Sequence, residues 1–131
     1  MDNIKVYQPP GEVSQVEAFI EDLHPKLREK LVCQIFRLSR TPPTELKEPH
    51  YKHFSIEKYR EFYELREKNR IVVRIIFTML PSGETLLLYA FQKRQSRDTM
   101  RALEHSLRLL SLLRDHPEHA VEYTVKEEQK S

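Results

Sequence analysis

The sequence predicts an α+β domain in which an N-terminal helical hairpin packs on a small antiparallel β-sheet and a C-terminal helix follows. Three observations predict this class. Apolar residues recur at helical spacing in residues 16–38, β-branched and aliphatic residues are densest in residues 60–97, and leucines form a helical stripe in residues 103–113. The 131 residues suffice for one modest core. We therefore expect a single domain at residues 1–131, with a core at about 4–114 and a C-terminal extension at 115–131.

Composition narrows the cellular setting. No apolar run approaches the roughly 18 residues that a membrane helix needs, and the N-terminus lacks the basic and apolar regions of a secretory signal. Cys33 is the single cysteine, so no internal disulfide can form. We expect a cytoplasmic protein without membrane contact. The net charge of +2 is too small to argue for nucleic acid by itself.

The N-terminal part of the chain predicts a short strand at residues 4–7 and then two helices. Ser14 and Glu17 have the spacing of a capping box at a helix start. Pro25 disfavours helical geometry at His24 and separates this helix from a second one at residues 26–38. The apolar faces of the two helices hold Val16, Phe19, Ile20, Leu23, Leu27, Leu31, Ile35 and Leu38.

The C-terminal part predicts three successive strands and a helix, after a polar and irregular stretch at residues 41–58. Spacing alone also allows a helix at residues 54–65, but period-2 alternation favours a strand at 60–66. Strands at 70–80 and 85–97 flank the turn at 81–84, and the first of these is apolar on both faces, as a central strand is. Ser96 or Asp98 can cap the last helix, which His116 and Pro117 end. The order is β-α-α-β-β-β-α, with residues 120–125 as a further short strand.

Arg74 needs a physical reason, because it lies between Val73 and Ile75 in an apolar strand. Burying a guanidinium group is costly unless it has a partner or faces a polar cleft. Two hypotheses follow: Arg74 binds a substrate anion, or it forms a structural pair with Glu64 across the strands.

Three short motifs, in this order and spacing, carry a resemblance. They are Tyr63-Glu64-Leu65-Arg66, Arg74-Ile75-Ile76-Phe77 and Leu87-Leu88-Tyr89-Ala90-Phe91-Gln92-Lys93-Arg94. Together with the order of elements, they resemble RelE/ParE-superfamily toxins of type II toxin–antitoxin modules, and most of all the HigB-like, phage-associated branch. The resemblance covers roughly residues 13–108.

The resemblance implies a toxin that cuts messenger RNA on the ribosome, without a metal or another cofactor. It also implies a partner antitoxin of the helix-turn-helix type. The residues that match the branch's active-site positions are Glu64, Arg66, Arg74, Lys93 and Arg94, and Tyr89 stands where the branch often has a histidine. In such a site arginines grip the phosphate, and Glu64 or Lys93 takes the proton of the attacking 2′-hydroxyl.

Other basic and aromatic residues predict contacts along an RNA strand. Tyrosines and histidines interleave with lysines and arginines in residues 51–63, and a basic cluster begins the last helix. The RNA-binding candidates are Lys52, Arg60, Tyr63, Tyr89 and Arg97. The plainer alternative is that they are ordinary loop, edge and helix-end residues.

Three further expectations remain open. A ParE-like toxin that binds a protein target such as gyrase, or an inactive peptide-binding adaptor, could use the same fold. The last helix has more leucines than one packing face needs: Leu109, Leu110, Leu112 and Leu113. We therefore expect these leucines to be partly exposed in the monomer. The antitoxin or a second copy of the chain would then bury them, the latter as a homodimer through the C-terminal helix. His50 and His53, like His116 and His119, lack a third ligand in the sequence, so we expect no metal site.

Overall fold

The computed structural model describes residues 3–125, and residues 126–131 of the expected extension lie outside them. The helices are α1 (Gln15–Glu21), α2 (Pro25–Leu38) and α3 (Ser96–Asp115). The strands are β1 (Ile4–Tyr7), β2 (Tyr51–His53), β3 (Phe62–Asn69), β4 (Ile71–Met79), β5 (Thr85–Lys93) and β6 (Ala120–Glu122). Short 3₁₀ turns occupy Pro43–Glu45, Glu57–Tyr59 and Pro117–His119. None of the helices in the described part of the chain is long and apolar enough to cross a membrane.

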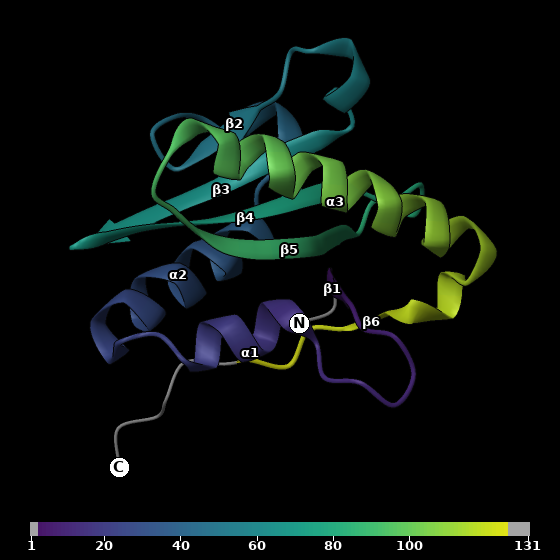
Figure 1. Ribbon diagram of the computed structural model, residues 1–131, viewed down its shortest axis with the longest axis horizontal. Helices are drawn as coiled ribbons and strands as arrows, with labels where there is room; N and C mark the ends of the chain where they lie inside the picture. The colour runs from purple at the N-terminus through teal and green to yellow at the C-terminus, as the bar shows by residue number, and fades with distance from the viewer. Residues whose placement is uncertain (1–2, 126–131) are drawn as a thin grey trace.

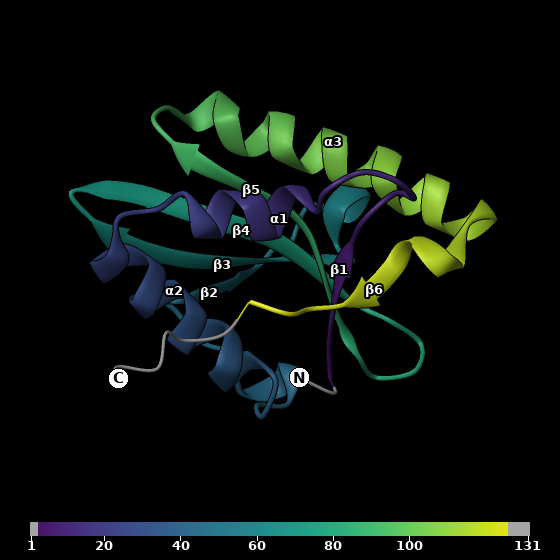
Figure 2. The ribbon, with the colours of Figure 1, turned by 90° about the horizontal axis from the view of Figure 1, so that it is seen from below.

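The strands form one six-stranded sheet in the order β2-β3-β4-β5-β1-β6. β1 runs parallel to β5, and the other neighbours are antiparallel. Helix α3 covers one face of the sheet, while α1 and α2 cover the other (Figures 1 and 2). The sheet therefore separates two hydrophobic cores, one under α1 and α2 and one under α3.

The core under α1 and α2 takes apolar residues from all three long strands. Leu65, Val73, Ile75, Phe77 and Leu87 supply it from the sheet, all of them fully buried. Burying one such side chain contributes roughly 1.5–3 kcal/mol. The second core, under α3, includes Phe62, Ile76, Leu86, Leu88, Phe91, Ala102, Leu103, Leu109 and Leu113.

Local sequence explains how several of these elements begin. Ser14 caps α1, accepting a hydrogen bond from the backbone N–H of Glu17 at 3.2 Å. Pro25 occupies the first turn of α2, where a missing N–H costs nothing. Gly83 has φ of 90° in the β4–β5 turn, a conformation that other residues rarely adopt. At the start of α3, Asp98 rather than Ser96 accepts from the backbone, from the N–H groups of Arg94 and Gln95.

The predicted α+β class is confirmed, with three differences in detail. The sheet is mixed rather than antiparallel, because β1 pairs with β5 in parallel. The short edge strand β2 was not predicted, since its three residues lie in a stretch without periodicity. Residues 54–65 form neither the alternative helix nor a strand from Arg60: a 3₁₀ turn at Glu57–Tyr59 precedes β3, which begins at Phe62.

The C-terminal segment returns to the N-terminal half. β6 pairs with β1, and the backbone N–H of Tyr123 donates to the carbonyl of Ile4. Tyr123 is fully buried, and the carboxylate of Glu17 accepts hydrogen bonds from both the backbone and the hydroxyl of Thr124. Residues 120–125 thus complete the core under α1.

Candidate functional site

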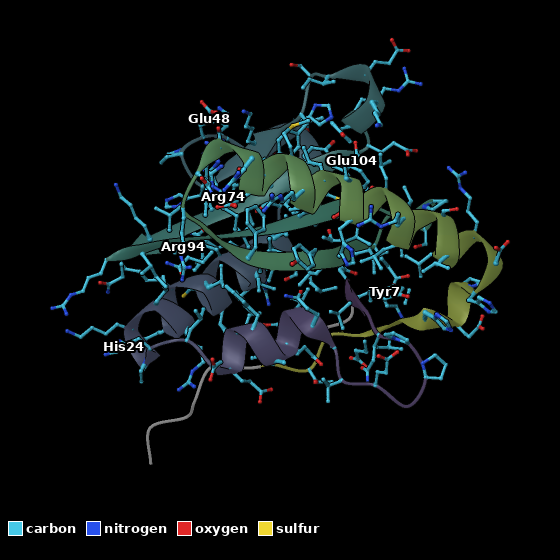
Figure 3. The ribbon with its side chains drawn as sticks, in the orientation of Figure 1. Tyr7, His24, Glu48, Arg74, Arg94 and Glu104 are labelled. Carbon is cyan, nitrogen blue, oxygen red and sulfur yellow. The ribbon has the colours of Figure 1, made fainter. Side chains whose placement is uncertain are left out.

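A buried carboxylate and two arginines meet on the α3 face of the sheet. Glu64 and Arg66 are two residues apart in β3, so they share a face. Arg74 in β4 lies directly opposite Arg66 in the strand register. Figure 3 shows Arg74 beside the N-terminal half of α3. We call Glu64, Arg66 and Arg74 the Arg–Glu cluster.

Both arginines donate to the same oxygen of Glu64. Arg66 Nε lies 2.8 Å and Arg74 Nη1 3.0 Å from Glu64 Oε1. The Glu64 side chain is fully buried, whereas Arg66 retains 23% and Arg74 14% of its side-chain exposure. Arg66 also lies 3.7 Å from the exposed carboxylate of Glu48. Glu64 therefore fixes two guanidinium groups side by side at the boundary between core and solvent.

The cluster is not fully satisfied by protein groups. Glu64 Oε2 and Arg74 Nε are buried, and neither has a hydrogen-bond partner among the described residues. Buried polar atoms normally have a partner, so each such exception asks for an explanation. Each guanidinium has five donors, and Glu64 takes one from each arginine. Guanidinium N–H groups that do not bind Glu64 are donors of the kind that grip an anion with several oxygens, such as a phosphate.

Three more of the basic candidates lie near the junction of β5 and α3. Lys93 is opposite Val72, which shares a face with Arg74, so Lys93 projects from the cluster's face of the sheet. Arg94 is exposed and donates to the side chain of Gln92 at 3.2 Å, so the structure does not bring it to Glu64. Arg97 is exposed in the first turn of α3.

The remaining RNA-binding candidates are divided between the two faces. Lys52 lies opposite Glu64 in the register and therefore on the face of the cluster. Tyr63 is on the opposite face, stacked between His53 and Phe77. Arg60 is exposed and lies 3.8 Å from Glu57, away from the cluster.

Tyr89 packs under α3, where the sequence did not anticipate its neighbour. Its ring lies 4.7 Å from that of His105, at 59°. Burial, and secondarily the Arg108 charge, lower the pKa of His105. An imidazole thus stands beside the position where the resemblance implies a histidine. No local sequence pattern links His105 to Tyr89, because His105 lies in α3, which packs over the sheet.

The four leucines of α3 are not equally exposed. Leu109 and Leu113 are buried and Leu110 is half-buried, so only Leu112, at 48% exposure, projects into solvent. The expectation of partial exposure therefore applies to one leucine above all.

Within residues 3–125, three residues that could hold a metal ion lie together at the end of α3. Glu118 supplies a third group beside His116 and His119, and the ligand atoms of the three lie within 4.8 Å of one another. The spacing of the two histidines does not by itself indicate Glu118 as a third ligand, because glutamates are common on exposed turns. By contrast, His50 lies 3.6 Å from Glu67, while His53 contacts the carbonyl of Arg60, so these two histidines have different partners.

Comparison with known proteins gives one family. The family model described as "Phage derived protein Gp49-like (DUF891)" matches residues 18–111, which include α2, α1 from Ala18, strands β2 to β5 and most of α3. No curated protein matches the sequence.

Proposed function

Since the chain belongs to the Gp49-like family of phage-derived proteins, a toxin-like family of RelE/HigB type, we propose that it is the toxin of a toxin–antitoxin pair and cleaves messenger RNA without a metal ion. The ribosome is the proposed place of cleavage, the cytoplasm the proposed compartment, and a helix-turn-helix antitoxin the proposed restraint. The observation that supports cleavage best is the Arg–Glu cluster, in which two arginines on adjacent strands are held together at the edge of solvent.

Arg66 and Arg74 take the role of phosphate binding. In cleavage by a neighbouring 2′-hydroxyl, that oxygen attacks phosphorus, the bond to the 5′-oxygen breaks, and negative charge grows on the phosphate oxygens. Guanidinium groups fixed in advance stabilise this charge, because no reorganisation is needed when it forms. Removing one such donor typically costs on the order of a hundredfold to a thousandfold in rate.

Glu64 has a positioning role in this proposal rather than the role of base. Its carboxylate is fully buried and already accepts from two arginines, so a substrate hydroxyl cannot reach it. Lys52, which is exposed, and Lys93, which is half-buried, both project from the same face, and we assign the proton transfer to Lys93.

The test is cleavage of an end-labelled messenger RNA by the purified protein, with excess EDTA and with or without ribosomes. We expect a 2′,3′-cyclic phosphate product, lost in Arg66→Ala and reduced in Lys93→Ala. Arg114→Ala removes an exposed arginine at the far end of α3 and should cleave like the wild type. Cleavage unchanged in Arg66→Ala, or abolished by EDTA, would contradict the mechanism.

The antitoxin is tested by coexpression with the neighbouring short reading frame. We expect growth arrest by the toxin alone and relief by its partner. The second candidate function is a toxin that binds a protein target, and the internal pairing of both arginines with Glu64 favours it. Growth arrest that persists without any RNA cleavage would support that candidate.

A further inference from the structure

A groove between α3 and β5 lies outside the Arg–Glu cluster. Aromatic side chains of β5 and one face of α3 line it, chiefly Tyr89, Phe91, Met100, Arg101, His105 and Arg108. We call it the α3–β5 groove. It belongs to the same α3 face of the sheet, but it is bounded by β5, whereas the cluster lies on β3 and β4 (Figure 3).

The backbone hydrogen-bonding groups at the free edge of β5, beside this groove, already have partners. β1 pairs with β5 only at Thr85, Leu86 and Leu87, so β5 continues beyond its neighbour. Beyond β1, the side chain of Gln15 in α1 pairs with the backbone of β5 in place of a strand. Its amide group donates to the carbonyl of Ala90 at 2.7 Å, and its amide oxygen accepts from the N–H of Ala90 at 2.9 Å. An added peptide strand would have to displace this pair, which argues against strand addition at this place.

The aromatic part of the groove suits a flat ligand. The ring of Tyr89 lies 4.7 Å from that of His105 and 6.1 Å from that of Phe91, the latter stacked at 18°. Tyr89 and His105 remain half-exposed. The lowered pKa of His105, caused mainly by burial, favours a neutral imidazole near pH 7, which can stack on a base.

The charge available in the groove is positive. Arg101 and Arg108 are exposed and seven residues apart on α3, which places them about 10.5 Å apart along the helix axis. Asp98 and Glu104 also line the groove, and their lowered pKa values keep both ionised. Glu104 forms an ion pair with Lys58 at 2.7 Å, and Asp98 accepts from the backbone N–H groups of Arg94 and Gln95. With Lys58 balancing Glu104, the two arginines outweigh Asp98, so the net charge that a ligand meets is positive.

We propose that the α3–β5 groove binds a segment of single-stranded RNA outside the cleavage site, with a base on Tyr89 and His105 and phosphates on Arg101 and Arg108. The proposal rests on the function proposed above and adds where the substrate is held. Aromatic rings beside arginines are the pattern of sequence-tolerant single-strand binding. Bases stack on the rings and the guanidinium groups neutralise phosphates.

The experiment measures binding of a fluorescent 2′-O-methyl RNA oligonucleotide, which cannot be cleaved through its 2′ position, by anisotropy over a range of salt. We expect Arg101→Ala/Arg108→Ala to weaken binding and to reduce the slope of log affinity against log salt by about 0.7 per arginine. Tyr89→Ala should weaken binding roughly 5- to 150-fold, and Tyr89→Phe should bind like the wild type. Arg114→Ala, on the same helix beyond the groove, is the matched control for charge.

Thermal unfolding of each variant separates lost binding from lost folding. Folded Arg101→Ala/Arg108→Ala protein with wild-type affinity and salt slope overturns the proposal. So does a groove-dependent affinity for polyglutamate with no affinity for the oligonucleotide, because the occupant would then be an acidic peptide. The oligonucleotide assay does not depend on cleavage. A wild-type protein that gives no cyclic-phosphate product would contradict the proposed function, whereas wild-type affinity and salt slope in Arg101→Ala/Arg108→Ala contradict the groove proposal, so the two failures are different results.

Discussion

The two faces of the sheet are built from the same strands but bury different chemistry. On the α1/α2 face, successive residues Val73, Ile75 and Phe77 of β4 are all apolar and fully buried. On the α3 face, the position between Val73 and Ile75 is Arg74, which pairs with the fully buried Glu64. Replacing a buried ion pair by apolar residues is often neutral or stabilising, so stability alone does not explain the α3 face. The α3 face is therefore the better candidate for a functional surface.

The largest expected effect tests the cluster itself. Arg74→Ala leaves a fully buried carboxylate with Arg66 as its one remaining guanidinium partner. Breaking a buried pair on one side costs about 3–5 kcal/mol of the free energy of unfolding, to be measured by urea denaturation. Arg114→Ala should stay within about 0.5 kcal/mol of the wild type. A stable Arg74→Ala protein that no longer cleaves RNA would instead make Arg74 a dispensable part of the fold and a purely functional residue.

The second change makes the α3 face as apolar as the other. Glu64→Leu/Arg66→Met/Arg74→Met removes the whole cluster at once, so no buried charge is left unpaired, and only the exposed Glu48 loses its contact with Arg66. We expect stability equal to the wild type or higher by about 1–4 kcal/mol, with RNA cleavage abolished. Unfolding and cleavage assays on the same preparation check this. A triple variant that fails to fold would show that the cluster is needed for the fold, which removes the functional argument.

The third prediction uses alkaline pH to probe the α1/α2 face, where two tyrosine hydroxyl groups, those of Tyr51 and Tyr123, have raised pKa values. Burial raises the pKa of Tyr51 from 10.0 to about 12, with Glu67 adding to the rise and Arg37 opposing it. Its hydroxyl donates to the backbone and side-chain oxygens of Gln34 at 3.0 and 3.1 Å. Burial also raises the pKa of Tyr123.

The folded state holds the proton of Tyr51 more tightly than the unfolded state does. The contribution of this group to the free energy of unfolding is therefore complete below pH 10 and is lost as the pH rises from 10 towards 12. After allowance for solvent screening at this half-exposed group, we expect a loss of about 1–2 kcal/mol for Tyr51. Unfolding curves from pH 8 to about 11 measure it. Tyr51→Phe should flatten this dependence, and an unchanged slope would assign the loss to other groups such as Tyr123.

The smallest effect is expected at the outer side of α3. Leu112→Ala should change the free energy of unfolding by less than about 0.5 kcal/mol, because the side chain projects into solvent. Leu109→Ala, a buried matched substitution on the same helix, should cost about 2–5 kcal/mol. Light scattering on both tests whether Leu112 is covered by a second copy. A dimer that dissociates only in Leu112→Ala would show that it is.

The sequence by itself determined the α+β class and the three long strands, because periodicity and β-branched density are local signals. It also identified Arg74 as a residue in need of a partner and offered Glu64 as that partner across the strands. The structure has this pair, at 3.0 Å. Cross-strand neighbours can be anticipated when two strands are adjacent in the chain and joined by a short turn.

Only the tertiary structure decided what depends on contacts between distant segments. The parallel pairing of β1 with β5, the clasp of Gln15 on Ala90 and the approach of His105 to Tyr89 join residues without any common local pattern. Burial is likewise a property of the assembled fold: the sequence left open whether Glu64 acts as a base or as a structural partner, and the structure buries its side chain fully against two arginines. The sequence determines which chemical groups a side chain carries, but the elements that pack over that side chain determine whether solvent or substrate can reach it.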